Sequence, residues 1–154
     1  MAISARKKLT DEWKDCGVTA HSEYAILTDE ITRAWSGMTT RQYKNLKGLK
    51  KESPRDNMSA AELVLNMLAE ISTKEISQTE RPEGFAESRD VAQRGGAIAG
   101  DNRKAIERQT GKTLIPSRTA AELNHVVTAM LETSSKEIEE ATIPAETDPN
   151  DKKQ

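Results

Sequence analysis

Apolar residues recur at three- and four-residue intervals through most of this chain, and this spacing constrains its fold more than any other feature. Such spacing is typical of amphipathic helices that bury one face. No segment bounded by turn residues alternates apolar and polar positions in the way expected of a half-buried strand. The sequence therefore predicts an all-α fold, a compact bundle of about five to six helices.

Two helices are expected near the N-terminus, from about Ser4 to Cys16 and from about Ser22 to Trp35. Gly17 and Gly37 follow them, and glycine commonly ends a helix because it adopts left-handed backbone without strain. Aromatic residues make up only 3% of the chain. The core must therefore be built from Leu, Ile, Val, Met and Ala, with the two tryptophans as its bulkiest members.

Two capping boxes mark further helix starts, Thr39 with Gln42 and Ser59 with Glu62. In this motif the first side chain accepts a backbone N–H of the first turn, and the Glu or Gln three residues on reaches back. The helix after Ser59 is expected to be the central helix of the bundle. The apolar residues expected to face the core from it are Leu63, Val64, Met67, Leu68 and Ile71.

The second half of the chain predicts a long helix between Pro82 and Gly111 and a last helix entered by Thr119. Periodicity ends after Ala141, and the residues that follow are mostly Pro, Glu, Asp and Lys, a composition typical of disorder. We therefore expect one helical domain over residues 1–141 and a disordered acidic tail over residues 142–154.

Three glycines, Gly95, Gly96 and Gly100, lie within the predicted long helix. Each costs roughly 1 kcal/mol relative to alanine in a helix, so their clustering requires an explanation. The absence of side chains lets another backbone approach closely, either from the same chain or from a second copy, and a hinge is another explanation. On this basis we predict a homodimer. A phosphate-binding loop is disfavoured because no strand precedes the glycines and no GxxxxGK[ST] pattern is present.

A cluster of basic residues forms the candidate binding site. It contains Arg41, Lys44, Lys47, Lys50, Lys51 and Arg55, with Glu52 as the one acidic residue among them. Phosphates of a nucleic-acid backbone attract such a cluster, and so does an acidic protein surface. A solvated loop with ordinary lysines is an equally valid interpretation, because a run of charge is only a hypothesis of binding.

Residues suited to catalysis or metal binding are few. The chain has two histidines, His21 and His125, and one cysteine, Cys16, with no spacing typical of a catalytic triad or a zinc site. We therefore predict no enzymatic activity, no metal and no cofactor. The single cysteine, the lack of a secretory signal and the lack of an apolar run of roughly 20 residues predict a cytoplasmic protein without a membrane partner.

The chain resembles the C-terminal region of DNA damage-inducible protein D and of related BRO-type phage antirepressor proteins. The resemblance extends from about Ala5 to Pro116, and its most specific part is YKNLKGLKKESPRDNMSAAEL. It implies a regulatory role in bacterial DNA damage (the SOS response), recombination or phage repression, with a host protein or nucleoprotein complex as partner. The N-terminal BRO domain, to which DNA binding is normally attributed, is missing. Of the matching turn, Lys47, Lys50 and Lys51 are the candidate contacts, chosen for their charge.

An alternative is an inhibitor encoded by a phage, such as an anti-CRISPR or similar anti-defence protein, that binds a host defence complex directly. Its binding surface would be acidic and would combine the second helix with the C-terminal segment. The residues concerned are Asp29, Glu30, Glu137, Glu139 and Glu140. A module that only oligomerises is the third interpretation.

Overall fold

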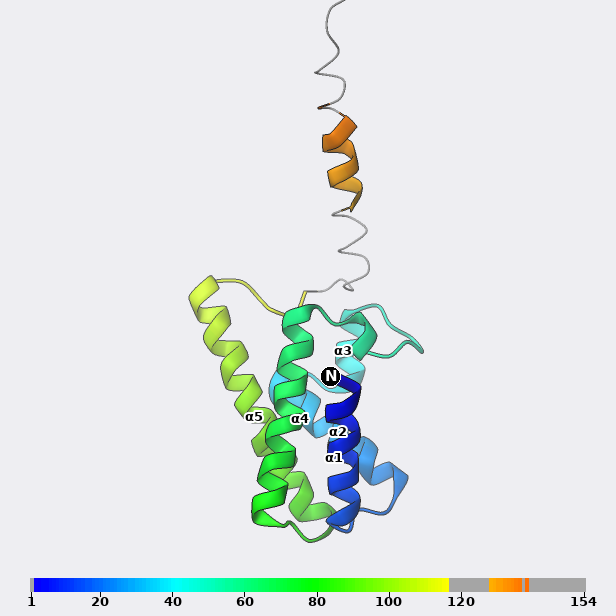
Figure 1. The fold of residues 1–154 in the computed structure, drawn as a ribbon, viewed down its shortest axis with the longest axis vertical. Coiled ribbons are helices and arrows are strands. Elements are labelled where there is room, and N and C mark those ends of the chain that lie inside the picture. Colours follow the sequence, from blue (N-terminus) through cyan, green and yellow to red (C-terminus); the bar gives the residue numbers. More distant parts are fainter. Residues whose placement is uncertain (1, 117–127, 137, 139–154) are drawn as a thin grey trace, which may run out of the picture. The chain divides into compact units, whose positions relative to one another are not determined.

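The computed structural model describes residues 2–116, 128–136 and 138. The chain divides into two compact units, Met1–Ala120 and Ala121–Gln154. Every regular element among the described residues is a helix (Figure 1), so the predicted all-α fold is confirmed. The first unit contains α1 (Ala2–Asp15), α2 (His21–Ser36), α3 (Thr40–Leu46), the 3-10 helix η1 (Arg55–Asn57), α4 (Ala60–Glu80) and α5 (Gly84–Thr110).

In the second unit, residues 128–136 are helical and their side chains are exposed. The predicted start of the last helix at Thr119 lies outside the described residues, as do the predicted domain end at residue 141 and the predicted tail.

Local signals set the ends of the helices as predicted. Thr39 Oγ1 accepts the backbone N–H of Gln42 at 3.1 Å, and Ser59 Oγ accepts that of Glu62 at 3.3 Å. In return the Glu62 carboxylate accepts the Ser59 N–H at 2.7 Å, which completes the capping box. Gly37 follows α2 with a left-handed φ of 77°, which costs glycine no strain.

The helices pack around α4 and α5, which run in opposite directions from a short connection (Figure 1). α5 packs along α2 on one side and along α4 on the other, and α1 packs on α4. Trp13 and Trp35 are fully buried, and each contacts a tyrosine ring with centroids 6.1 Å apart. The core cluster comprises Leu9, Trp13, Val18, Leu27, Ile31, Trp35, Tyr43, Leu65, Ala69, Ala92, Ala99 and Ile115.

The buried face of α4 differs from the predicted one. Its buried residues are Glu62, Leu65, Asn66, Ala69, Glu70, Thr73 and Ser77, most of them polar or small. Val64 and Ile71, which were expected in the core, are 63% and 42% exposed. The apolar periodicity correctly predicted a helix but not its orientation, because small residues are required where α5 approaches and both buried glutamates have cationic partners.

Candidate functional site

The basic residues predicted as a contact surface lie on α3 and in the loop between α3 and α4, and the structure divides them. Three side chains are exposed, those of Arg41, Lys50 and Lys51, and we call these residues the basic surface. Lys44 is half-buried on α3. Lys47 and Arg55 both extend to glutamates of α4. The predicted cluster is therefore two sites and not one.

Lys47 is not a contact residue, and its prediction as one is wrong. Its side chain is fully buried, and its ammonium lies 2.9 and 3.0 Å from the two carboxylate oxygens of Glu62, which is also fully buried. The Tyr43 hydroxyl donates to the same carboxylate at 2.6 Å. Burial, and then this carboxylate, raise the pKa of Tyr43 far above its ordinary value. Lys47 therefore neutralises Glu62 inside the protein and is unavailable to a partner.

The loop that carries the basic surface is held in place at several points. Leu49 is 8% exposed, which anchors the chain between Lys47 and Lys50. The exposed Glu52 carboxylate accepts the backbone N–H groups of Lys50 at 2.7 Å and of Lys51 at 3.1 Å. Backbone hydrogen bonds, the largest from Glu52 itself, lower the pKa of this carboxyl. Glu52 thus orders the turn, and its carboxylate is hydrogen-bonded to the backbone of the two lysines and not to their ammonium groups.

A second buried glutamate, Glu70 on α4, joins the loop to α1. Its Oε1 accepts from Arg55, and Arg6 of α1 approaches the same oxygen at 4.0 Å. Arg6 also donates to the Thr28 hydroxyl of α2. The other oxygen, Glu70 Oε2, is buried and has no hydrogen-bond partner among the described residues. The Glu70 carboxylate thus orients Arg55 and Arg6 through Oε1, and its Oε2 can still accept a hydrogen bond.

Burial is the largest influence on this carboxyl group. It raises the pKa of Glu70 above the ordinary value, against the lowering effect of Arg55 and then of Arg6. Burial likewise lowers the pKa of Arg6, although a guanidinium stays charged at any physiological pH. The two arginines therefore compensate Glu70 only in part.

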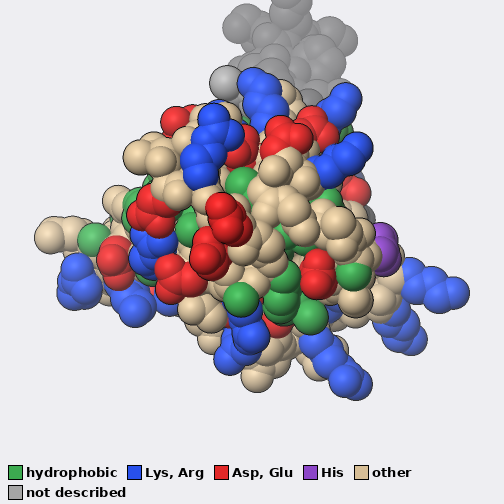
Figure 2. Space-filling view, turned by 90° about the horizontal axis from the view of Figure 1, so that it is seen from below, with side chains coloured by type: hydrophobic (Ala, Val, Ile, Leu, Met, Phe, Trp, Pro, Cys, Tyr) green, Lys and Arg blue, Asp and Glu red, His purple; other side chains and the backbone are tan. Residues whose placement is uncertain are grey.

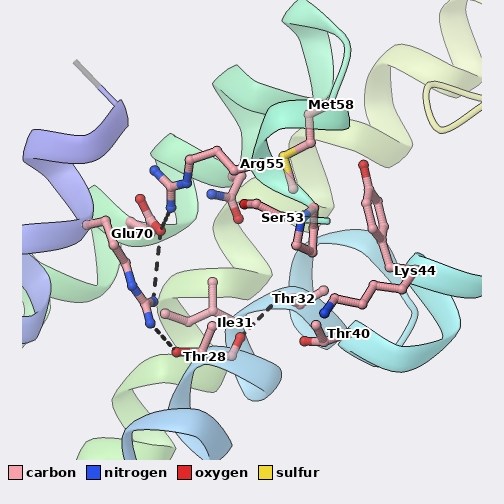
Figure 3. A pocket seen from close by; sticks show the side chains of 13 residues that line it. Thr28, Ile31, Thr32, Thr40, Lys44, Ser53, Arg55, Met58 and Glu70 are labelled. Atoms are coloured by element: carbon pink, nitrogen blue, oxygen red, sulfur yellow. Dashed lines mark hydrogen bonds and ion pairs between the residues drawn. The ribbon is translucent and has the colours of Figure 1, made fainter. Parts of the chain in front are cut away.

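A cavity of about 250 Å³ lies beside these groups, between α1, α2, α3, α4 and the loop. We call it the polar pocket. Figure 3 shows Lys44 extending toward Thr32 and Thr40, and Arg55 extending to Glu70. The Thr40 hydroxyl is buried and has no hydrogen-bond partner among the described residues. The pocket is lined by Arg6, Thr28, Ile31, Thr32, Thr40, Tyr43, Lys44, Ser53, Pro54, Arg55, Met58, Asn66 and Glu70.

Sequence reasoning found only part of this pocket. Lys44 and Arg55 were predicted as binding residues because they belong to the basic cluster. Arg6, Thr40 and Glu70 were missed, since they lie far apart in the chain and carry no common motif. The one available signal was a glutamate within the apolar repeat of α4, which indicates a buried partner of opposite charge.

Comparison with known proteins gives no relative: no family model, curated protein or solved structure matches the chain. The resemblance to DNA damage-inducible protein D therefore stays a prediction, based on the residues quoted above.

The three glycines of α5 lie in contacts within the chain. A Cβ at Gly95 would lie 2.6 Å from backbone atoms of Thr73 on α4, and one at Gly100 would lie 2.3 Å from the Ala34 carbonyl oxygen of α2. A Cβ at Gly96 would lie 2.5 Å from the Ala34 methyl group. All three glycines are buried. Close packing of α5 on α2 and α4 accounts for them, so a homodimer would need another surface.

The predicted acidic surface is not present on α2. Glu30 is 6% exposed, and it accepts from Arg89 at 2.7 Å and from Gln93 at 2.9 Å. Asp29 accepts the backbone N–H of Thr40 at 2.7 Å. The other predicted members, Glu137, Glu139 and Glu140, lie outside the described residues. Figure 2 shows acidic and basic side chains interspersed on the end of the molecule that it views.

Among the described residues no group of three or more His, Cys, Asp or Glu side chains is placed to hold a metal ion. Over the same part of the chain, no helix combines the length and apolar character of a membrane span. His21 is exposed at the start of α2, and His125 lies outside the described residues.

Proposed function

We propose that the chain is a regulatory binding module without catalytic activity, which contacts DNA within a recombination, repair or repressor complex through the basic surface. The observation that carries the proposal is the exposure of Arg41 on α3 and of Lys50 and Lys51 on the following loop, where Lys47 and Leu49 are buried. Together with Glu52, whose carboxylate accepts from the backbone of both lysines, these three residues carry a net excess of two positive charges. Such a surface attracts backbone phosphates and releases their counterions on binding.

The anchoring of the loop supports this proposal. A flexible lysine loop pays conformational entropy when it binds, whereas an ordered loop has paid most of that cost on folding. Here Leu49, the Lys47–Glu62 ion pair and the Glu52 carboxylate hold the backbone on both sides of Lys50. The backbone that carries Lys50 and Lys51 is therefore presented in one arrangement.

The partners of the proposed module follow from the resemblance. A role around bacterial DNA damage implies a cytoplasmic location and a host protein or nucleoprotein complex as partner, and a phage gene is an alternative source. A homodimer stays part of this proposal, because palindromic DNA sites are commonly bound by two copies of a protein.

Titration of duplex DNA at several salt concentrations tests the proposed contact. Affinity should fall steeply as salt rises, and Lys50→Ala combined with Lys51→Ala should reduce the slope of log K against log salt by roughly two, at about 0.9 for each phosphate contact. Lys14→Ala is the matched control, since Lys14 is exposed in the last turn of α1 (Figure 1), away from α3. No binding at low salt, or an unchanged slope in the double variant, refutes the proposal.

A second candidate function is direct binding of a host protein, as an inhibitor would require. The exposed apolar residues of α4, Val64 and Ile71, favour it, because they lie seven residues apart and so on one helix face. In this case Val64→Lys should abolish binding to a purified repair or defence complex, and the Lys50→Ala, Lys51→Ala variant should bind it normally. The opposite pattern supports the basic surface.

A further inference from the structure

We propose that the polar pocket binds a phosphate monoester that also carries a hydroxyl group, such as a sugar phosphate or a nucleotide. This site is separate from the basic surface, and none of Arg41, Lys50 and Lys51 lines it. The inference therefore stands whether or not the chain binds duplex DNA.

The charges around the pocket match a dianion. Arg6, Lys44 and Arg55 line it together with the carboxylate of Glu70, so three cations and one anion leave an excess of two positive charges. A phosphate monoester carries a charge of about −1.5 to −2 at neutral pH, whereas a carboxylate ligand would leave one positive charge uncompensated. Partly buried cations without compensation are costly, so a dianion is the preferred occupant.

The cations approach the cavity from opposite sides. Lys44 extends from α3 toward Thr32 and Thr40, and Arg55 comes from the loop with its guanidinium toward Glu70 (Figure 3). Among the described residues, the Lys44 ammonium has no hydrogen bond or ion pair, and its charge acts only at longer range on Glu52. A phosphate between these walls would receive Lys44 on one side and the arginines on the other.

Two buried polar atoms of the pocket lack a partner among the described residues, and together they indicate the chemistry of the ligand. Thr40 Oγ1 is a hydroxyl that can donate to a phosphate oxygen. Glu70 Oε2 is an acceptor only, which would repel a phosphate oxygen and accept from a hydroxyl. A buried acceptor without a donor is destabilising, so a ligand hydroxyl at this position is favourable.

The size of the cavity limits the ligand. Pockets for drug-sized molecules usually measure about 300 to 1,000 Å³, and this cavity is smaller, at about 250 Å³. It therefore suits a phosphorylated sugar, or the phosphate and sugar of a nucleotide whose base stays outside. The same chemistry occurs in a free metabolite and at the 5′-phosphorylated end of an RNA strand, whose terminal ribose keeps its 2′-hydroxyl.

Calorimetric titration of the full chain tests the proposal. The probes are ribose 5-phosphate, ribose, inorganic phosphate, and a short oligoribonucleotide with either a 5′-phosphate or a 5′-hydroxyl end. Ribose 5-phosphate should bind at least tenfold more tightly than ribose and more tightly than inorganic phosphate. Lys44→Met should weaken its binding at least tenfold, and Thr40→Val about threefold or more. Lys14→Met, at an exposed lysine outside both the pocket and the basic surface, should bind ribose 5-phosphate as the wild type does.

The outcomes separate the two sources of phosphate. Binding of ribose 5-phosphate with equal affinity for the 5′-phosphate and 5′-hydroxyl oligoribonucleotides supports a free metabolite. Tighter binding of the 5′-phosphate form than of the 5′-hydroxyl form, lost in Lys44→Met, supports a strand end. Absence of ribose 5-phosphate binding at millimolar concentration overturns the inference. So does full affinity in Lys44→Met, provided that circular dichroism shows the variant folded. Because Lys50 and Lys51 are outside the pocket, failure of the duplex titration leaves this result unaffected.

Discussion

Replacement of Lys47 by methionine is the most informative single change, because the sequence predicts Lys47 to be an exposed contact residue and the structure places it in a buried ion pair. Methionine keeps the length of the side chain and removes its charge. If Lys47 were a surface contact, stability would change by no more than about 0.5 kcal/mol. In the structure the change removes the cation that lies 2.9 Å from Glu62 and leaves a fully buried carboxylate behind.

The size of the effect follows from the environment of Glu62. After the substitution its carboxylate would keep the Tyr43 hydroxyl at 2.6 Å and the Ser59 N–H at 2.7 Å, but no cation. Removal of one member of a buried ion pair costs about 3–5 kcal/mol. A domain of this kind is stable by about 5–15 kcal/mol in total, so the variant should be close to unfolding.

Urea unfolding followed by far-ultraviolet circular dichroism and tryptophan fluorescence measures this effect. With a denaturant slope of about 1–3 kcal/mol/M, we expect the midpoint to fall by roughly 2 M with the slope unchanged. Lys50→Met is the matched control, since Lys50 is exposed three residues away, and its midpoint should stay at the wild-type value. Equal midpoints for Lys47→Met and Lys50→Met would refute the burial of Lys47 and restore it as a surface residue.

Three further predictions concern buried or partly buried groups. Gly95→Ala should lower the free energy of unfolding by about 1–3 kcal/mol, because its Cβ would lie 2.6 Å from the Thr73 backbone. In a thermal melt, any increase in stability would contradict this close contact. Burial raises the pKa of Glu70, so its contribution to stability is present below the ordinary pKa and is lost as pH rises through the folded-state pKa. The free energy of unfolding of the wild type, minus that of Glu70→Gln, should therefore increase from pH 7 toward pH 5. A difference that does not change with pH would be evidence against a raised pKa of Glu70. Burial, followed by Glu12, raises the pKa of the Cys16 thiol, so iodoacetamide should alkylate it more slowly at pH 8 than a free cysteine peptide. Equal rates would show an unperturbed thiol.

Features set by neighbouring residues could be predicted from the sequence. The capping boxes of Thr39 and Ser59 need only a partner three residues on, and both are present. Gly37 and Gly111 end their helices for an equally local reason, their left-handed backbone. The helical class followed from the same information, because periodicity within a segment decides between helix and strand.

Features set by distant residues could not be predicted in the same way. The buried face of α4 is polar because Glu62 meets Lys47 and Glu70 meets Arg55, pairs separated by 15 residues in each case. Arg6 reaches Thr28 across 22 residues. A run of lysines and arginines does not show which members turn inward, since that depends on where carboxylates of another helix are placed.

We infer that the two ion pairs of α4 mainly fix the conformation of the loop between α3 and α4, and contribute less to the overall stability of the protein. Glu62 and Glu70 are eight residues apart, about 12 Å along a helix, and they hold Lys47 and Arg55, which lie near the two ends of the loop. Replacement of a buried pair by apolar residues of similar volume is often neutral or stabilising.

We therefore expect Lys47→Met combined with Glu62→Leu to recover most of the stability that Lys47→Met alone loses, in the same urea assay. The double variant should nevertheless bind DNA less tightly than wild type and show faster amide hydrogen exchange at Lys50 and Lys51, because the loop loses one of its attachments. Tyr43 would also lose the acceptor of its hydroxyl, so Tyr43→Phe in the same background should change little. If the double variant keeps wild-type exchange rates and DNA affinity, then Leu49 and Glu52 alone order the loop, and the buried ion pair has no part in presenting the basic surface.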